Sequence, residues 1–491
     1  MLRSWKLPVA LLLAGLPLAA PAADAAPAPC RVAGIANEVL CGSVSRPLDP
    51  ARPDGARIDV HYAVVPAKAR RKRPDPVVLL AGGPGQSAIG LAPDVMALLG
   101  RLNNRRDVVF VDQRGTGRSA PLACEEDQDR RAPIAEQADP ERLVRRMAEC
   151  RAALVKLPHV RVAANLGFFT TTIAMQDLDA VRQVLGAPRI NLVGASYGTR
   201  AALEYMRQFP DAVRRVVIDG VAPPDMVLPA TVSPDAQAVF DALLAACTAE
   251  PACAKNHPTL RADWDALLKG LPRPSTVVHP LTGRAETFTL TRDMVLSAVR
   301  GPLYAPWLAA ALPVAIGEAA QGRDQALLTL GTRLGSRRAT DLAMGMHFSV
   351  VCAEDAPRLA ASADRPGADF GPGFAAQYAR VCADWPRGVV PAAFYSVPPF
   401  PRPVWVGSGG LDPVTPPRHG GRIAKALGPT ARHIVIANAG HGTMSIGCLR
   451  DLLFRFVDAT EDSEALAIDA SCATAVPRPL AFEPVRAEVA R

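Results

Sequence analysis

The sequence lacks the short motifs that mark metal-dependent and nucleotide-binding proteins. It contains no Cys-x-x-Cys and no His-Glu-x-x-His, so it has no zinc site of the usual spacing. Its glycine-rich segment 81–87 is not followed by Gly-Lys-Ser or Gly-Lys-Thr, which excludes a phosphate-binding loop of that type. No internal repeat is visible, which argues against a solenoid or propeller. We therefore predict a globular protein that needs no metal and no cofactor.

Aromatic residues and excess charge are also scarce. Phe, Trp and Tyr make up 5% of the chain, and the formal net charge is +8 over 491 residues. The one dense basic run, 68–73, has no aromatic residue next to it, and we expect it to form a solvated hairpin turn between two strands. These features predict that the protein has no nucleic-acid partner.

Long uncharged runs occur in two places. In the first, Arg3 and Lys6 precede the uncharged stretch 7–23, which ends on small residues and predicts a cleaved signal peptide over 1–25. An uncleaved membrane anchor is the alternative, but the stretch is short and contains three prolines. The second run, 301–317, predicts a buried helical segment. We expect a secreted or periplasmic protein with no stable membrane insertion after cleavage.

The ten cysteines all follow the predicted signal peptide, and an exported chain can keep disulfides. Their number is even, so no odd thiol suggests a catalytic cysteine. Counting alone leaves the connectivity open, but neighbours in the sequence predict five local pairs. These are Cys30–Cys41, Cys124–Cys150, Cys247–Cys253, Cys352–Cys382 and Cys448–Cys472.

Short runs rich in Val and Ile alternate with helical patterns along much of the chain. We predict strands at 58–65, 76–80, 107–111, 190–193, 216–218, 404–406 and 434–436. Between them lie amphipathic segments such as 173–185, which follows three threonines and ends at a glycine. This alternation predicts an α/β fold with a mostly parallel central sheet that is covered on both faces.

The strand signal fades between residues 226 and 400. That interval is rich in Ala, Leu and Pro and holds four of the cysteines. We predict a mainly helical cap at 226–400, inserted into a core that is formed by 26–225 and 401–491. An independent second domain is the alternative, but the strand pattern resumes after the interval together with candidate catalytic residues.

The strongest local signal is Gly194-Ala195-Ser196-Tyr197-Gly198. It is a G-x-S-x-G motif that follows a predicted strand and precedes a predicted helix, 199–209. A serine on such a turn is lifted above the sheet in a strained backbone, and the small residues around it leave room for that turn. We therefore predict that Ser196 is a nucleophile.

A serine nucleophile requires a general base and an acid that orients the base. Of the three histidines after residue 400, His441 lies in a flexible loop just after the last predicted strand, so we predict that it is the base. Asp412 follows the strand 404–406 and is the predicted acid. Asp219, at the end of an earlier strand, is the rival candidate.

The tetrahedral intermediate needs preorganised hydrogen-bond donors. The backbone N–H of Tyr197 is one candidate, because it directly follows the nucleophile. The second is expected in the glycine-rich loop 81–87, where absent side chains let the chain aim an amide at the substrate. We predict that the N–H of Gly83 is this donor.

Three segments in order, 81–85, 112–119 and 194–198, resemble the proline iminopeptidase and tripeptidyl aminopeptidase group of α/β-hydrolases. Segments 410–416 and 440–442 resemble the C-terminal part of the secreted tripeptidyl aminopeptidases. The resemblance implies an α/β-hydrolase fold and a secreted serine exopeptidase whose substrates are peptides with a free N-terminus. It differs at Ala81, where proline iminopeptidases usually carry His.

The same resemblance bears on two further sites. The segment Cys352-Ala353-Glu354-Asp355 resembles a cap element of the tripeptidyl branch, which implies that Glu354 or Asp355 binds the substrate's α-amine. A solvated acidic turn beside a disulfide is the alternative. In the segment 112–119, Arg114 is expected to pin the loop behind the active site, or else to line the cleft.

Two other functions stay open at this point. An esterase or lactonase would use the same triad, because the fold does not fix the acyl donor. A secreted, non-catalytic binding protein would also keep the fold, although the complete set of Ser196, Asp412 and His441 argues against it. A requirement for a free substrate amine would distinguish the peptidase from the other two.

Overall fold

The computed structural model describes residues 26–124, 132–137, 139–332 and 342–483. The predicted signal peptide, 1–25, lies outside these residues. Within the described ranges, no helix is both long enough and apolar enough to cross a membrane.

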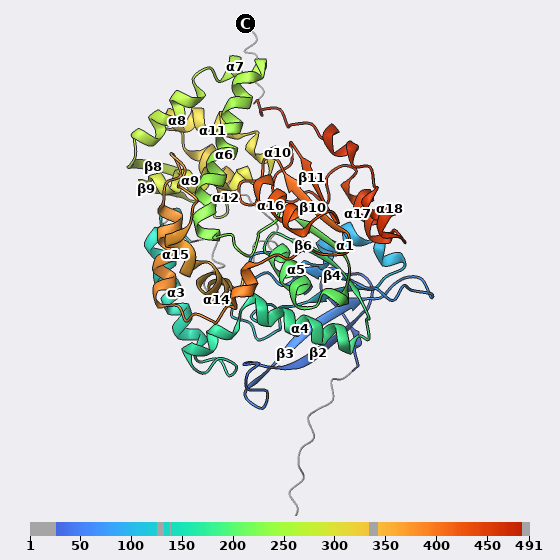
Figure 1. The fold of residues 1–491 in the computed structure, drawn as a ribbon. Coiled ribbons are helices and arrows are strands. Elements are labelled where there is room, and N and C mark those ends of the chain that lie inside the picture. Colours follow the sequence, from blue (N-terminus) through green and yellow to red (C-terminus); the bar gives the residue numbers. More distant parts are fainter. Residues whose placement is uncertain (1–25, 125–131, 138, 333–341, 484–491) are drawn as a thin grey trace, which may run out of the picture.

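A mixed β-sheet forms the centre of the molecule (Figure 1). In the described part of the chain it has nine strands in the order β1-β2-β3-β5-β4-β6-β7-β10-β11. The six strands from β5 to β11 pair in parallel, and β1, β2 and β3 add an antiparallel edge. Their bounds are Ala28–Cys30 (β1), Val39–Pro47 (β2), Arg57–Val65 (β3), Val77–Leu80 (β4), Val108–Val111 (β5), Ile190–Ala195 (β6), Val213–Asp219 (β7), Val404–Gly409 (β10) and Ala431–Ile436 (β11). The predicted mostly parallel sheet is confirmed.

The sheet departs from the sequence predictions at one edge. β1 and β2 were not predicted, because β2 is largely half-buried and contains Gly, Ser and Pro in place of a Val/Ile run. The hairpin predicted at 68–73 is wrong, since β3 pairs with β5 and not with β4. The segment instead crosses over β5, where the backbone N–H groups of Lys68 and Ala69 donate to the carbonyls of Asn103 and Asn104.

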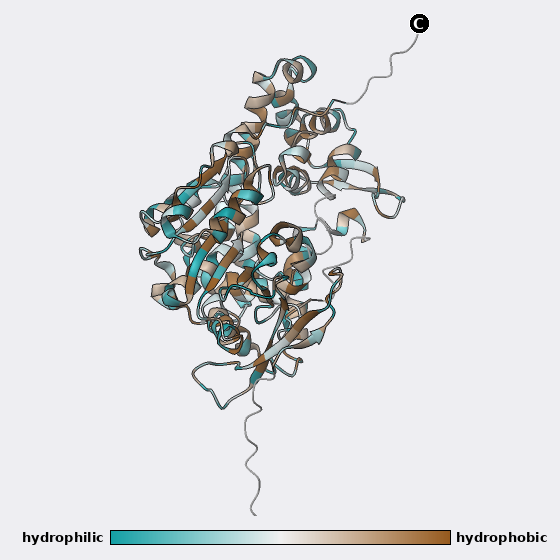
Figure 2. Ribbon diagram, turned by 90° about the vertical axis from the view of Figure 1, so that its right-hand side faces the viewer, coloured by the Kyte–Doolittle hydropathy of each residue, from teal (hydrophilic) through white to brown (hydrophobic). Residues whose placement is uncertain are grey.

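Helices cover both faces of the sheet. Helix α1 (Ala88–Leu99) and helix α17 (Leu449–Asp458) contribute to one apolar core, whereas α4 (Thr171–Val184), α5 (Tyr197–Gln208) and α16 (Pro417–Leu427) contribute to the other. The strands between them supply both cores: Val77 and Leu79 belong to the core with α1 and α17, and Val78 and Leu80 belong to the core with α4, α5 and α16. The helices mix apolar and polar stretches, as amphipathic covering helices do (Figure 2).

The interval 226–400 is mainly helical, as predicted, and also contains an antiparallel hairpin that the sequence did not indicate. Many of its apolar side chains form a core separate from those of the sheet. The elements are α6 (Leu228–Ala249), α7 (Pro251–Asn256), α8 (Leu260–Lys269), β8 (Arg273–Val278), β9 (Ala285–Leu290), α9 (Arg292–Leu303), α10 (Pro306–Ala309), α11 (Leu312–Ala320), α12 (Gln325–Thr332), α14 (Met344–Glu354) and α15 (Gly373–Asp384). The uncharged run 301–317 lies within α9 to α11. Helix α14 packs with the sheet core, so the domain limits 226 and 400 stay a prediction.

Five disulfides staple the chain locally, in the pairs Cys30–Cys41, Cys124–Cys150, Cys247–Cys253, Cys352–Cys382 and Cys448–Cys472. Cys352–Cys382 joins α14 to α15, and Cys247–Cys253 joins α6 to α7. The longest-range of the five spans only 30 residues, so each disulfide stabilises a local unit and none ties the two ends of the core together.

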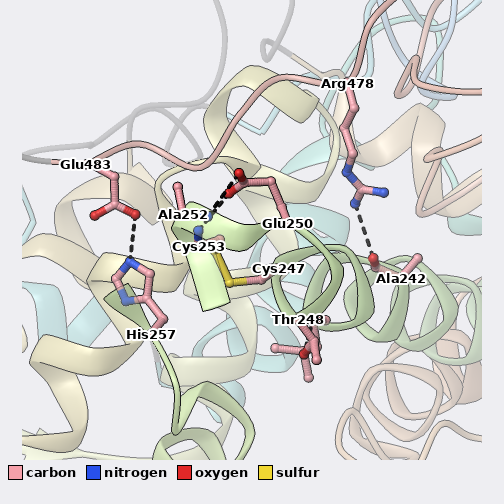
Figure 3. The surroundings of a disulfide bond; sticks show 10 residues. Ala242, Cys247, Thr248, Glu250, Ala252, Cys253, His257, Arg478 and Glu483 are labelled. Carbon is pink, nitrogen blue, oxygen red and sulfur yellow. Dashed lines mark hydrogen bonds and ion pairs between the residues drawn. A yellow bond between two sulfur atoms is a disulfide. The ribbon is translucent and has the colours of Figure 1, made fainter. Parts of the chain in front are cut away.

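A segment that we call the strap, residues 476–483, runs from the core onto the cap, and Figure 3 shows Arg478 and Glu483 of this segment against residues of the cap. At its core end, Asn438 donates a side-chain hydrogen bond to the carbonyl of Val476. On the cap, Arg478 donates to the carbonyl of Ala242 at 3.2 Å, and Glu483 lies 3.2 Å from Nε2 of His257. The N–H of Phe482 also donates to the carbonyl of Ala310. The strap is thus a third connection between cap and core, beside the two chain crossings.

Candidate active site

Ser196 lies on the sharp turn between β6 and α5. Its backbone has φ 55° and ψ −125°, a strained conformation for a residue with a side chain. Positions 194 and 198 of this turn have no room for a side chain. A Cβ on Gly198 would lie 2.0 Å from the carbonyl oxygen of Leu80, and a Cβ on Gly194 would lie 2.5 Å from the carbonyl oxygen of Gly198. The G-x-S-x-G motif therefore takes the strand-turn-helix position that the sequence predicted, with Ser196 partly exposed at its tip.

The structure brings His441 and Asp412 together. His441 lies in the loop after β11, Asp412 follows β10, and Nδ1 of the imidazole lies 2.8 Å from Oδ2 of the carboxylate. Asp412 is fully buried and accepts three further hydrogen bonds, from the N–H groups of Val414 and Thr415 at 2.9 Å and from the Thr415 hydroxyl at 2.7 Å. These bonds fix the carboxylate against the imidazole, which is what a partner for a catalytic histidine requires.

The two groups shift each other's pKa. Burial alone would lower the pKa of His441, but the charge and hydrogen bond of Asp412, together with the charge of Asp219, raise it above the usual 6.5. Burial alone would raise the pKa of Asp412, but His441 and the Thr415 hydrogen bonds hold it below its usual range. Asp412 therefore stays ionised at neutral pH and stabilises the imidazolium.

Asp219, the rival candidate acid, does not hydrogen-bond the imidazole. Its buried carboxylate accepts from the N–H of Thr443 at 2.6 Å, from the Thr443 hydroxyl at 2.7 Å and from the N–H of Met444 at 3.1 Å. Its backbone carbonyl accepts from the N–H of Ser196 at 3.0 Å. Asp219 thus holds both the loop that carries His441 and the turn that carries Ser196. Burial raises the pKa of its carboxyl.

The glycine-rich loop lies next to the serine. A Cβ on Gly82 would lie 3.3 Å from Cβ of Ser196, and Gly83 has φ +108°, which favours glycine. Tyr197 is the first residue of α5, so its N–H has no partner within the helix. The backbones of these residues therefore border Ser196, and the oxyanion role of Gly83 and Tyr197 stays a prediction.

Glu354 and Asp355 contact Arg200 of α5, and both are fully buried. Asp355 accepts two hydrogen bonds of 3.0 Å from the buried guanidinium of Arg200, and Glu354 accepts from the N–H of Thr171 at 2.8 Å and from Arg200 at 3.4 Å. Burial raises the pKa of Glu354 to about 7 despite Arg200. Neither carboxylate is open to a substrate ammonium in this structure, and their implied role as the amine site stays a prediction.

Arg114 is also buried. Its guanidinium bonds Asp177 at 2.7 and 2.9 Å and donates to the carbonyls of Leu48 and Phe168 at 2.9 Å. It ties the loop after β5 to its surroundings, which agrees with the expected pinning role. Among the described residues, no cluster of three His, Cys, Asp or Glu side chains is arranged to hold a metal ion.

Sequence reasoning missed three residues that shape the site. Thr415 and Thr443 fix the two carboxylates, and threonines in loops carry no signal that would single them out. The backbone carbonyl of Tyr304, in the cap, accepts a hydrogen bond from the backbone N–H of His441 at 2.9 Å, and the Tyr304 ring meets the imidazole edge-on with centroids 5.4 Å apart. Tyr304 lies inside the uncharged run 301–317, where the sequence carries no feature that indicates a contact with His441.

Comparison with known proteins gives one family match and several relatives. The model of the α/β hydrolase fold matches residues 75–445. The serine protease Hip1 of Mycobacterium tuberculosis is 27% identical over 436 residues, which cover 81% of this chain and 82% of Hip1. Carboxylesterase B of the same species is 28% identical over 421 residues, 79% of this chain and 78% of that protein. The tripeptidyl aminopeptidase of Streptomyces lividans is 33% identical over 201 residues, 38% of this chain and 36% of the relative.

Proposed function

The chain belongs to the α/β-hydrolase family, and from that membership we propose that it is a serine peptidase in which Ser196, His441 and Asp412 form the catalytic triad. The observation that carries the proposal is the strained Ser196 turn at the same edge of the sheet as the His441–Asp412 pair, in which the carboxylate is fully buried and the imidazole is partly exposed. In this arrangement Ser196 is the nucleophile, His441 the general base and Asp412 the group that holds the imidazole tautomer.

The chemistry is acyl transfer. Oγ of Ser196 attacks the substrate carbonyl while His441 takes the hydroxyl proton, and the negative oxygen that forms is stabilised by the N–H groups of Gly83 and Tyr197. Collapse of this intermediate breaks the C–N bond, and His441 gives its proton to the leaving amine. Water then attacks the acyl-enzyme with His441 again as the base, which releases the acid and restores the serine.

We further propose that the substrates are peptides with a free N-terminus, cleaved by a tripeptidyl or prolyl aminopeptidase type of reaction in a secreted or periplasmic setting. Similarity to Hip1 and to the tripeptidyl aminopeptidase supports peptides as the substrate class. The five disulfides support an oxidising compartment.

The test is a series of peptide amides offered with free and with acetylated N-termini, together with a short-chain ester. We expect cleavage that depends on Ser196 and falls sharply on acetylation. Equal cleavage of both forms would retain the peptidase and refute the exopeptidase. Turnover of the ester alone would favour the second candidate, an esterase, which the similarity to carboxylesterase B supports.

A further inference from the structure

The cap contains a cavity of about 830 Å³ between α3 (Pro140–Leu154), α9, α12, α15 and the turn of the β8–β9 hairpin. These elements gather on one side of the cap (Figure 1). The volume is within the range of sites that bind small molecules and short peptides. Apolar side chains such as Met294, Leu328 and Phe374 form much of its wall, and Val278 and Leu281 of the hairpin are about half exposed at its rim.

One end of the cavity is linked to His441 through Tyr304. Arg300 of α9 lines the cavity, and Tyr304 follows it by one helical turn. Tyr304 is the residue that accepts from the N–H of His441 and packs its ring against the imidazole. Arg300 is therefore separated from the general base by a single side chain.

The same end is also linked to the glycine-rich loop through Tyr378 and His347. Phe374 of α15 lines the cavity, and its ring lies 4.6 Å from that of Tyr378. The hydroxyl of Tyr378 lies 2.9 Å from Nε2 of His347, and Nδ1 of the same ring lies 3.0 Å from the carbonyl oxygen of Pro84, next to Gly83. Two chains of contacts thus connect this end of the cavity to His441 and to the loop that carries Gly83.

Arg300 supplies the charge at this end. Its guanidinium lies over the ring of Phe374, 5.3 Å from the centroid, and its charge acts on both Tyr304 and Tyr378. Across the described ranges, no carboxylate lies within ion-pair distance of it. The ligand group that best complements a guanidinium in a partly apolar wall is a carboxylate, because the planar N–H donors of arginine can bind both carboxylate oxygens with two hydrogen bonds.

The other charged groups of the cavity do not cancel Arg300. Arg142 pairs with Glu136 at 3.3 Å, and Asp139 pairs with Arg145 at 2.9 Å. Asp293, the remaining acidic group of the lining, precedes Arg300 by seven residues on α9, which is about 10 Å along the helix axis. The end of the cavity nearest His441 is therefore positive.

We propose that Arg300 binds a carboxylate of the substrate, so that the enzyme prefers peptides that carry a negative charge close to the scissile bond. The inference rests on the proposed function, because it takes the scissile bond to be held between Ser196 and His441. The carboxylate comes either from an acidic side chain or from the C-terminus of a short peptide, and both sources offer Arg300 the same group.

The test measures kcat/KM for matched substrates with wild type, Arg300→Gln, Arg300→Lys and the control Arg101→Gln. Arg101 also lies over an aromatic ring, that of Phe454, but is outside the cap. One pair of peptides has Glu or Gln next to the scissile bond, and a second pair has a free or an amidated C-terminus. A third pair consists of esters that carry Glu or Gln.

We expect wild type to prefer the carboxylate member of at least one peptide pair, and the pair concerned identifies the source. Arg300→Gln should lower kcat/KM for that member by about 10- to 100-fold and leave the neutral member within about threefold. Arg300→Lys should retain part of the preference, and Arg101→Gln all of it. Because the neutral substrate is measured in the same variant, a general loss of folded enzyme cannot imitate this result.

An equal loss on both members of every pair would overturn the proposal and show a structural role for Arg300. Absence of any preference in wild type that cleaves neutral peptides would also overturn it, while leaving the peptidase assignment intact. If only the esters are cleaved, the peptidase assignment fails, and the Glu and Gln esters then decide the role of Arg300.

Discussion

Replacing each of the two buried carboxylates near His441 by an amide distinguishes the triad acid from the residue that holds the loop. In Asp412→Asn, the amide oxygen can still accept from the N–H groups of Val414 and Thr415, which leaves the amide nitrogen facing Nδ1 of His441. A donor at that place favours the tautomer with its proton on Nε2, which cannot take the proton of Ser196. We expect kcat to fall by about 10⁴-fold, or roughly 5.4 kcal/mol.

Asp219→Asn should behave differently. The amide oxygen can accept from the N–H groups of Thr443 and Met444, and the amide nitrogen can donate to the Thr443 hydroxyl, so all three contacts have a neutral counterpart. Each bond weakens by about 1 kcal/mol when its acceptor loses its charge, but the cost of burying that charge also disappears. We expect kcat to fall by no more than about tenfold.

The assay is kcat on a Ser196-dependent substrate, with the active enzyme counted by covalent titration of the serine and the fold checked by thermal unfolding. The predicted ratio of the two effects is at least about 10³, a difference of about 4 kcal/mol. A loss of about 10⁴-fold in Asp219→Asn with a mild effect in Asp412→Asn would refute the assignment and make Asp219 the triad acid.

Three further predictions follow from the site and the disulfides. Ser196→Ala should lose about six orders of magnitude in kcat and keep the thermal unfolding of wild type; near-normal turnover would disprove the nucleophile. His441 acts as a base only when it is neutral, and its pKa is raised above 6.5, so kcat/KM measured from pH 5 to 9 should fall as the pH drops through that raised value. In Asp412→Asn the fall should move to lower pH. A pH profile that does not move in this variant would contradict the pairing of His441 with Asp412. Removing the Cys352–Cys382 disulfide by a double substitution to Ala should lower the free energy of unfolding, measured in urea, by about 3.6 kcal/mol, because the bond closes a loop of 30 residues. Reduction of that bond should have the same effect. An unchanged midpoint of the urea unfolding curve would show that the bond does not stabilise the native state.

The sequence was most informative where one residue type has one structural use. Val and Ile runs located the parallel strands, and Gly194 and Gly198 located the nucleophile turn, because only glycine fits there. It was least informative where a partner lies far along the chain. The prediction of a hairpin at 68–73 was wrong because β3 pairs with β5, whereas the strand that follows β3 in the sequence is β4.

The same limit applies to the site. Nothing near Glu354 and Asp355 in the sequence shows that Arg200, more than 150 residues earlier, occupies both carboxylates. Asp412 and Asp219 each follow a strand and look alike as residues, and the choice between them depends on which one reaches Nδ1 of His441. Position along a sheet predicts a candidate, whereas hydrogen-bond geometry assigns its role.

The strap limits the ways in which the cap can move. If the cap were joined to the core only by the two chain crossings, it could rotate as a rigid body about the line through them. The strap adds contacts with Ala242, His257 and Ala310, so such a rotation must break these contacts as well as that between Tyr304 and His441. Cutting the chain within residues 476–483 would therefore remove the strap's restraint on the cap without touching a residue of the triad.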